Sequence, residues 1–347
     1  MEILQTTAFN QKMLIENLKV GLKVMGSRLF NKKVSLFVTF LTTNQCNRKC
    51  VYCNIDKNKK SKMMDTNQVI NMIKQFRSKG MQQINFTGGE PLLRADIGKI
   101  ISFSRKIGVK TILTTNGDLI KKNIGKLKDV NFTYLCLNGN EKVHDELRGK
   151  DSYNNTMDAI NILHKRGMSI AINMILTKKN LDQIDFVYKK AREYEARIYF
   201  TPVYNFKPAN ITKKQLNQIK PANREIKKAF KFIEKLKKEG GHVLNSKKYI
   251  DNIINKGYHS YYFRNCLMGK LAFTIKPNGN ISPCYKFVDE RGLKNVIVLG
   301  VDKALISTKE RDCHNCNYNC HIEQNLLLKF EPSAIINLLE NYQIFEK

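Results

Sequence analysis

The chain lacks tryptophan and is poor in acidic residues, with 30 Asp and Glu against 60 Lys and Arg, so its formal net charge is +30. It also lacks a long apolar run. The longest, VSLFVTFL at 34–41, is far shorter than the roughly 20 residues that span a bilayer, so we expect no transmembrane helix. With 42% hydrophobic residues among 347, the chain can still bury a sizeable core, which excludes a disordered protein.

The N-terminus lacks the pattern of a secretory signal. The first residues, MEILQTTAFNQKM, contain Glu2 and show no basic region followed by an apolar one. We therefore expect a cytoplasmic protein. In a reducing compartment the nine cysteines, an odd number, indicate metal ligands or catalytic thiols and exclude a disulfide framework.

The basic charge is concentrated in one segment. Residues 207–248 hold 13 Lys and Arg against three Asp and Glu. Such a segment can bind nucleic acid, anionic lipid or an acidic peptide, or it can be the solvated surface of helices in a lysine-rich chain. No aromatic platform is interleaved with these lysines as single-strand binding would favour, so the solvated surface is the preferred interpretation and nucleic acid is disfavoured.

Short β-rich runs alternate with helical patterns in the first 205 residues. Strands are predicted at 34–41, 82–86, 109–114, 132–137, 168–176 and 197–203, with helices near 66–79, 94–107, 118–127, 153–166 and 180–194. This alternation predicts βαβ crossovers and a parallel sheet. The sequence after Tyr204 does not supply the two further units of an eight-unit barrel, so the predicted α/β fold is a six-unit partial parallel barrel.

Composition divides the chain into four predicted parts. They are an N-terminal helical leader at 1–33, the α/β core at 34–205, a basic helical connector at 206–257 and a small cysteine-rich α+β module at 258–347. The leader places Leu14, Leu18, Leu22, Met25 and Leu29 on one helical stripe, with lysines off it. A basic amphipathic helix of this kind lies on a membrane surface or packs on its own domain, and both alternatives stay open.

Three cysteines directly follow the first predicted strand. Cys46, Cys50 and Cys53 are spaced Cys-x3-Cys-x2-Cys in the segment QCNRKCVYCN. Three thiolates so close together can ligate three irons of a cubane cluster and leave the fourth iron open to a substrate or cofactor. A zinc site would need a fourth ligand, and no Cys or His follows within reach along the chain.

This triad, with Tyr52 before its last cysteine, resembles the signature of the radical S-adenosylmethionine (SAM) enzymes. The second strand ends in Thr87-Gly88-Gly89-Glu90-Pro91, similar to that family's GGEP segment, and the third ends in TNG. The fourth strand reads CLNG followed by VHDELRG, similar to the family's SLDG and HDxxRG block. The resemblance assigns a set of residues to SAM binding: Tyr52, Gly88, Gly89, Glu90, Thr115, Asn116, Gly117 and Arg148.

The residue types at these positions suit a ligand site on physical grounds. Gly88 and Gly89 let backbone groups approach a ligand closely, and Glu90 can accept a hydrogen bond from an ammonium group. Asn116 and Gly117 tolerate positive φ in a turn that could meet a ribose. Arg148 either pairs with a ligand carboxylate or is structural.

One departure from the family pattern concerns the fourth strand. Where relatives usually have Ser-x-Asp-Gly, this chain has Cys136-Leu137-Asn138-Gly139, which leaves open any SAM contact of that Ser or Asp. Cys136 follows the strand alternation and is predicted to be a small core residue. His144 is predicted to be a hydrogen-bonded structural residue.

The five remaining cysteines are all C-terminal: Cys266, Cys284, Cys313, Cys316 and Cys320. The segment LAFTIKPNGNIS between the first two predicts a β-hairpin with its turn at 277–280. A hairpin with a thiolate at each end, followed by a cysteine-rich segment, indicates a metal site, and a four-cysteine structural zinc is one alternative.

This segment resembles the SPASM or twitch extension of radical SAM enzymes, which holds auxiliary iron–sulfur clusters. A full SPASM domain uses seven cysteines, whereas this extension has five. Five allow one auxiliary 4Fe-4S cluster with four ligands and leave one thiol over. Which of Cys313, Cys316 and Cys320 is the spare thiol stays open.

The resemblance implies an activity. SAM would bind the open iron of a 4Fe-4S cluster and be cleaved reductively to a 5′-deoxyadenosyl radical, which abstracts hydrogen from a substrate. The layout favours a peptide or protein substrate, as in maturases, and an electron donor such as flavodoxin or ferredoxin. The alternatives are a small-molecule or lipid-precursor substrate, handled at a membrane surface through the leader helix, and a non-enzymatic iron–sulfur or zinc scaffold.

Overall fold

Six parallel strands form the first part of the fold in the computed structural model. The structure describes residues 20–27, 29–53, 62–204, 212–259, 266–311, 313, 316 and 318–341. The strands are β1 Phe37–Leu41, β2 Gln83–Thr87, β3 Lys110–Thr115, β4 Phe132–Cys136, β5 Ile170–Leu176 and β6 Arg197–Pro202. Each pairs in parallel with the next, which confirms the predicted six-unit α/β fold.

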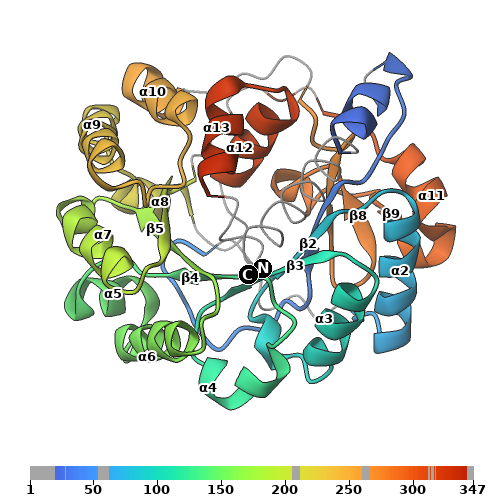
Figure 1. Ribbon diagram of the computed structural model, residues 1–347, viewed down its shortest axis with the longest axis horizontal. Helices are drawn as coiled ribbons and strands as arrows, with labels where there is room; N and C mark the ends of the chain where they lie inside the picture. The colour runs from blue at the N-terminus through green and yellow to red at the C-terminus, as the bar shows by residue number, and fades with distance from the viewer. Residues whose placement is uncertain are drawn as a thin grey trace, which may run out of the picture.

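Helices connect these strands and surround them in Figure 1. They are α2 Thr66–Ser78, α3 Ile97–Lys106, α4 Ile120–Asn123, α5 Glu141–Arg148, α6 Ser152–Lys165 and α7 Ile184–Glu193. The start of α2 is fixed as predicted, because the Asp65 side chain accepts a hydrogen bond from the backbone of Gln68 and the Gln68 side chain returns one to Asp65. The helix predicted at 118–127 is shorter, since α4 passes into a 3-10 turn at Ile124–Lys126.

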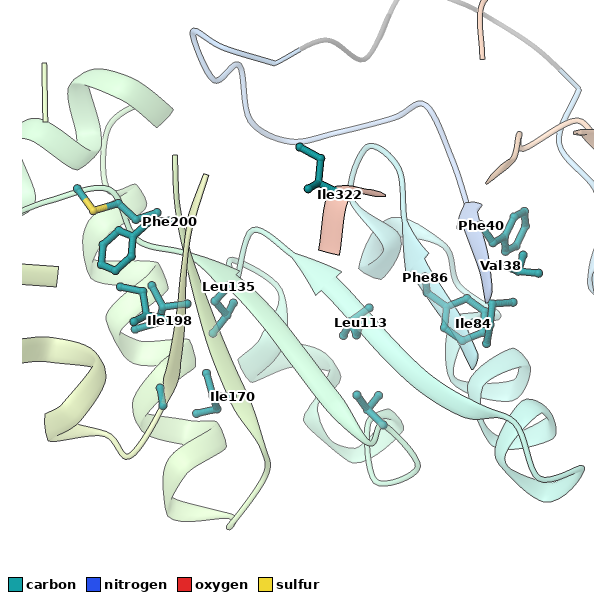
Figure 2. Packing of buried hydrophobic residues seen from close by; sticks show 14 of the residues in the cluster. Val38, Phe40, Ile84, Phe86, Leu113, Leu135, Ile170, Ile198, Phe200 and Ile322 are labelled. Atoms are coloured by element: carbon teal, nitrogen blue, oxygen red, sulfur yellow. The ribbon is translucent and has the colours of Figure 1, made fainter. Parts of the chain in front are cut away.

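The two faces of the parallel strands differ in chemistry. Apolar residues such as Val38, Ile84, Phe86 and Leu113 form the core between the strands and the helices, as Figure 2 shows. Because side chains alternate along a strand, the residues between them point to the opposite, inner face. Those residues are mostly polar or aromatic: Thr39, Asn85, Thr114, Tyr134, Cys136, Asn173, Tyr199 and Thr201.

The predicted C-terminal hairpin is confirmed, and it extends the same sheet. Its strands are β7 Ala272–Ile275 and β8 Asn280–Ser282, followed by β9 Lys294–Asn295. β7 pairs in parallel with β1, so the sheet has the order β6-β5-β4-β3-β2-β1-β7-β8-β9. The ends of β1 and β7 therefore lie side by side, which brings the two cysteine-rich segments to one region. The boundaries of the four predicted parts stay a prediction.

The basic connector is helical, as predicted. It forms α8 Lys213–Ile219, α9 Asn223–Gly240 and α10 Lys247–Lys256. Helix α9 buries Ile226, Phe230 and Ile233. It carries ion pairs between Glu234 and Lys238 and between Glu239 and Lys235, so these two lysines lie on a solvated surface, whereas Lys237 donates to the Val243 carbonyl and the Asn337 side chain. Helices α11 Val296–Ser307, α12 Asn319–Leu328 and α13 Pro332–Glu340 complete the C-terminal part. Within the described ranges, no helix is long and apolar enough to cross a membrane.

The described part of the leader is a helix over residues 20–27. Val24 is buried and packs with Leu36 and Leu267. The predicted apolar stripe does not pack there, because Leu22, Met25 and Leu29 are 59%, 50% and 75% exposed. Leu14 and Leu18 lie outside the described residues. The side of the helix that packs on the domain is therefore not the stripe that the sequence pattern selects.

Candidate active site

The Cys46 loop continues from β1 at the carboxyl edge of the sheet and is held by backbone hydrogen bonds. The Thr42 amide donates to the Thr87 carbonyl at 2.8 Å, and the Gly89 amide donates to the Thr43 carbonyl at 2.7 Å. The Glu90 amide then donates to the Gln45 carbonyl at 2.8 Å. The loop that carries the cysteine triad thus runs beside the GGEP segment for its first residues.

The backbone of the cysteine loop approaches the two glycines of GGEP so closely that a side chain would not fit at either position. A Cβ atom on Gly88 would lie 2.6 Å from the Thr43 carbonyl oxygen, and one on Gly89 would lie 1.9 Å from that of Gln45. Gly88 also has φ +126°, which favours glycine. The backbone that approaches these glycines is the chain's own cysteine loop, and their contact with SAM stays a prediction.

Glu90 joins the ends of the second and third strands. Its carboxylate is fully buried and accepts hydrogen bonds from the Leu92 amide at 3.0 Å, the Thr115 hydroxyl at 2.8 Å and the Asn116 amide at 2.8 Å. Burial raises the pKa of Glu90 to about 7, although the three donors oppose that shift. These internal bonds engage both carboxylate oxygens. The contact of Glu90 with an ammonium group, expected from the sequence, stays a prediction.

The TNG turn contacts the cysteine loop directly. Gly117 has φ +95°, as predicted for this turn. The side-chain amide of Asn116 donates to the Asn47 side chain at 2.8 Å and lies 3.9 Å from the Cys46 sulfur. A thiolate at Cys46 would therefore have an N–H donor beside it.

An ion pair fixes the middle of the same loop, and the sequence did not predict it. Arg48 lies between the first two cysteines and pairs with Asp118, with Nη2 donating to Oδ1 at 2.7 Å. The Asn47 side chain donates to the other Asp118 oxygen at 2.6 Å, and Arg48 also donates to the Lys150 carbonyl at 2.6 Å. The only sequence signal was the polar stretch inside the Cys-x3-Cys spacing, which does not identify a partner 70 residues away.

Tyr52 is fixed by two residues of the fourth βα unit. Its hydroxyl accepts from the Asn138 side chain at 2.7 Å and from Arg148 Nη1 at 3.0 Å. Asn138 is fully buried, and its Oδ1 accepts from the Ile175 amide at 2.9 Å. An amide suits this position because it donates and accepts at once. The residue that departs from the family pattern thus supports the cysteine loop.

His144 and Cys136 have different outcomes. His144 is fully buried on α5, its Nδ1 accepts from the Asn138 amide at 3.1 Å, and burial lowers its pKa to about 3, which confirms a structural residue.

The prediction that Cys136 is a core residue is wrong. It is half-buried at the end of β4 and interacts electrostatically with Arg148 and Tyr52. Its place at the strand's last position turns it toward the inner face.

The chemistry of the first donor set fits an iron–sulfur cluster. Cys46, Cys50 and Cys53 are half-buried on one loop, and none of them is in a disulfide. Arg148 interacts electrostatically with Cys50, and its buried Nε has no hydrogen-bond partner in the described part of the chain. The positive charge and the N–H donor of Arg148, beside three thiols, favour the binding of an anionic iron–sulfur cluster. In the ranges that the structure describes, no three His, Cys, Asp or Glu side chains lie close enough together to chelate a single ion.

The C-terminal cysteines come together from three segments. A Cβ on Gly269 would lie 2.7 Å from Pro283 and 3.7 Å from Glu310, which shows how closely these segments approach. Cys284 interacts electrostatically with Cys266, Cys313 and Cys316. Lys286 donates to the Cys313 sulfur at 3.2 Å, and Asn325 donates to the Cys266 sulfur at 3.4 Å. Burial raises the pKa of Cys284 and raises that of Cys316 to about 12.

Cys320 faces a different environment. It is the most accessible of the nine cysteines, and Tyr134, Tyr199 and Tyr204 all interact electrostatically with it. Tyr134 and Tyr199 belong to the inner face of the sheet. Tyr204 stacks on Tyr318, with ring centroids 4.1 Å apart, in the first turn of α12. Cys320 thus interacts with tyrosines of the inner face and also with Cys316, one of the thiols around Cys284.

Tyr285 connects the two cysteine-rich segments. Its ring lies 5.3 Å from that of Tyr318, and it interacts electrostatically with both Cys53 and Cys320. The aromatic group of Tyr204, Tyr285 and Tyr318 therefore stands between the first cysteine loop and the C-terminal cysteines.

Comparisons with known proteins agree with this arrangement. Fe-coproporphyrin III synthase of Methanosarcina barkeri is 26% identical over 170 residues, which is 47% of this chain and 43% of that protein. A probable GTP 3′,8-cyclase of Sulfurisphaera tokodaii is 30% identical over 157 residues, 44% of this chain and 50% of that protein. The chain thus spans about half the length of these curated relatives.

Solved structures share the fold over a larger part of the chain. Streptococcus suis SuiB bound to S-adenosylmethionine has a TM-score of 0.67 at 17% identity, covering 85% of this chain and 70% of that one. AnSMEcpe with AdoMet and the Cp18Cys peptide has a TM-score of 0.62 at 20% identity, covering 89% and 99%. Residues 40–191, which include the cysteine triad and the segments that hold it, match the Radical SAM superfamily, to which this part of the chain belongs.

Proposed function

We propose that the protein cleaves SAM reductively at a 4Fe-4S cluster held by Cys46, Cys50 and Cys53, and that it removes hydrogen from a peptide or protein. The observation that carries the proposal is the built loop: GGEP, TNG and the Tyr52 contacts fix the triad from three neighbouring strand ends. When bound, the cluster supplies the electron that breaks the SAM S–C5′ bond and yields a 5′-deoxyadenosyl radical.

The chain's own residues would orient these groups. Asn116 would donate toward the Cys46 thiolate, and Arg148 would offset the negative charge near Cys50. Gly88, Gly89, Glu90, Thr115 and Gly117 would set the shape of the SAM site, mainly by holding the loop. The stacked tyrosines would exclude water from the inner face, where a substrate radical must be protected.

An auxiliary 4Fe-4S cluster is proposed at Cys266, Cys284, Cys313 and Cys316. The mutual electrostatic interactions of these thiols, and the approach of their three segments, support that set. Cys320 is then the spare thiol, because it interacts with tyrosines of the inner face as well as with Cys316. A structural zinc is the competing proposal, and it would require these four thiols to move together, because no three such ligands among the described residues lie close enough to chelate a single ion.

Peptide substrates are supported by the solved structures with the same fold, since one is bound to AdoMet and the Cp18Cys peptide and another to the precursor peptide SuiA. The inner face offers amides and hydroxyls, among them Asn85 with Thr114 and Asn173 with Thr201, that suit a peptide backbone. The names of the curated relatives favour the alternative, a small-molecule substrate. A flavodoxin or ferredoxin would supply electrons.

The first experiment tests SAM cleavage. Anaerobically reconstituted, reduced protein is expected to convert SAM to 5′-deoxyadenosine, measured by liquid chromatography with mass spectrometry, and a Cys50→Ala variant is expected to lose this. Cleavage that persists in Cys50→Ala would overturn the assignment of the triad. A protein that binds iron but never cleaves SAM would favour the non-enzymatic scaffold.

The second experiment counts metal. Two clusters predict about eight irons per chain, and Cys284→Ala or Cys316→Ala should retain about four. Cys320→Ala is the matched control and should keep all eight. A count of about four irons and one zinc per chain would contradict the auxiliary cluster and support the structural zinc site.

A further inference from the structure

The leader helix exposes apolar side chains on the side away from the domain. Leu22, Met25, Leu29 and Phe30 are 59%, 50%, 75% and 71% exposed, while Val24 on the other side is 2% exposed. An amphipathic helix on a globular protein normally buries its one apolar side. This helix is already seated through Val24, and its second apolar side is left uncovered by the described residues.

The end of α11 continues this apolar surface. Lys33 donates from Nζ to the Ile306 carbonyl at 3.2 Å, which places the C-terminal end of α11 beside the segment that follows the leader helix. Figure 1 shows the blue helix next to the orange α11. Ile306 is itself 69% exposed. We call the surface formed by Leu22, Met25, Leu29, Phe30 and Ile306 the leader patch.

Basic side chains surround the leader patch. Lys23 and Lys32 are exposed, and the Lys32 ammonium lies 6.0 Å from the centre of the Phe30 ring. Lys270 donates to the Asn31 side chain at 2.7 Å. The acidic Asp302 on α11 is paired with Lys79 at 2.8 Å. The patch therefore presents apolar side chains with several lysines beside them, on a chain whose net charge is +30.

We propose that the leader patch docks the enzyme peripherally on an anionic lipid bilayer. Exposed Leu, Met and Phe side chains can enter the acyl boundary while flanking lysines meet anionic headgroups. A second copy of the chain is a poorer occupant, because a two-fold interface would bring the same lysines of the two copies close together, on chains that each carry a net charge of +30. The proposal rests on this surface and not on the proposed reaction, so either can fail alone.

Flotation of the full-length, reconstituted protein tests the proposal. It is expected to float with phosphatidylcholine vesicles that contain roughly 30% phosphatidylglycerol, to float poorly with phosphatidylcholine alone, and to be released by high salt. The double variant Leu29→Gln/Phe30→Gln should bind at least about tenfold more weakly. The matched control, Ile336→Gln/Leu339→Gln, replaces two side chains on α13 that are each 54% exposed, and it should bind as the wild type does.

Three outcomes would overturn docking on lipid. They are no flotation with anionic vesicles, an equal loss in the α13 control, and a wild-type dimer in solution that the leader-patch variant dissociates. Iron content and thermal midpoint are measured for both variants. Equal values attribute a loss of binding to the surface, and an unfolded variant is replaced by Met25→Gln, which alters one exposed side chain.

Discussion

The two cysteine-rich segments of this protein are built in different ways. The Cys46 loop is fixed by backbone hydrogen bonds to GGEP and by the buried groups of Glu90, Asp118 and Asn138. At the C-terminal thiols, the side chain of Lys286 donates to the Cys313 sulfur and that of Asn325 donates to the Cys266 sulfur. Burial there raises the pKa of Cys284, which disfavours the thiolate unless a cation binds it.

The fold therefore fixes the loop of the first site through hydrogen bonds. At the second site we expect the arrangement of the thiols to depend on the metal that they bind. Metal binding to buried thiols displaces protons and contributes to folding. We therefore expect substitutions around the Cys46 loop to disturb one cluster selectively. The predictions below sharpen or break this contrast.

The largest effect is expected from Asp118→Ala. The side chains of Arg48 and Asp118 are only 11% and 9% exposed, so the variant leaves a mostly buried guanidinium without its carboxylate. The free energy of unfolding should fall by about 3 kcal/mol. Denaturant unfolding measures it, and iron analysis should show loss at the first cluster with the C-terminal one kept. Equal loss from both clusters would break the contrast.

Gly89→Ala should come next. Its Cβ would lie 1.9 Å from the Gln45 carbonyl oxygen, so the cysteine loop must move. A displacement of this size should reduce the rate of SAM cleavage by about 100-fold. Gly125→Ala is the control, because nothing lies within 4 Å of its added Cβ. A Gly89→Ala enzyme with the wild-type rate would contradict the role given to this close approach.

Glu323, on α12 of the C-terminal part, gives a pH effect. Burial raises its pKa to about 7, so the folded chain binds this proton more tightly than the unfolded chain. Stability from this group is present at low pH and is lost as the pH rises to about 7, at no more than about 1.4 kcal/mol per pH unit. Glu323→Gln keeps an acceptor for the Ser246 amide. In this variant the unfolding free energy should fall less steeply between pH 5 and 7, by up to about 1.4 kcal/mol per pH unit. An unchanged slope would argue against it.

The smallest effect is expected from Asp302→Ala. Its ion pair with Lys79 joins α11 to the end of α2, but the two side chains are 61% and 41% exposed. Removing it should change the unfolding free energy by less than about 0.5 kcal/mol. This substitution also serves as the exposed counterpart of Asp118→Ala, and a comparable loss in both would show that burial does not set the difference.

Local patterns in the sequence predicted much of the fold. The six strands, the helices between them and the hairpin around Gly279 were accessible because alternation, capping residues and turn residues act over a few positions. The cysteine spacings selected both candidate sites for the same reason. The pairing of β7 with β1 was not accessible, since a hairpin sequence does not state which sheet edge it joins.

The roles of individual side chains depended on distant partners. Gly89 and Glu90 were identified by sequence, but their contacts with Gln45 and Asn116 come from other strand ends. Arg48 and Asp118 formed no local pattern. The apolar stripe of the leader was visible, yet its outward orientation followed from Val24 packing on Leu36 and Leu267.

Short-range spacing in the sequence predicts the α/β alternation, the cysteine triad and a second group of cysteines, because each depends on residues only a few positions apart. Only the tertiary structure decided which thiols face one another. Cys266, Cys284, Cys313 and Cys316 interact electrostatically with one another from the segments beside β7 and β8 and before α12, and Cys320 interacts with Cys316 as well as with Tyr134 and Tyr199. That choice is made by packing between elements far apart in the chain, which no local spacing encodes.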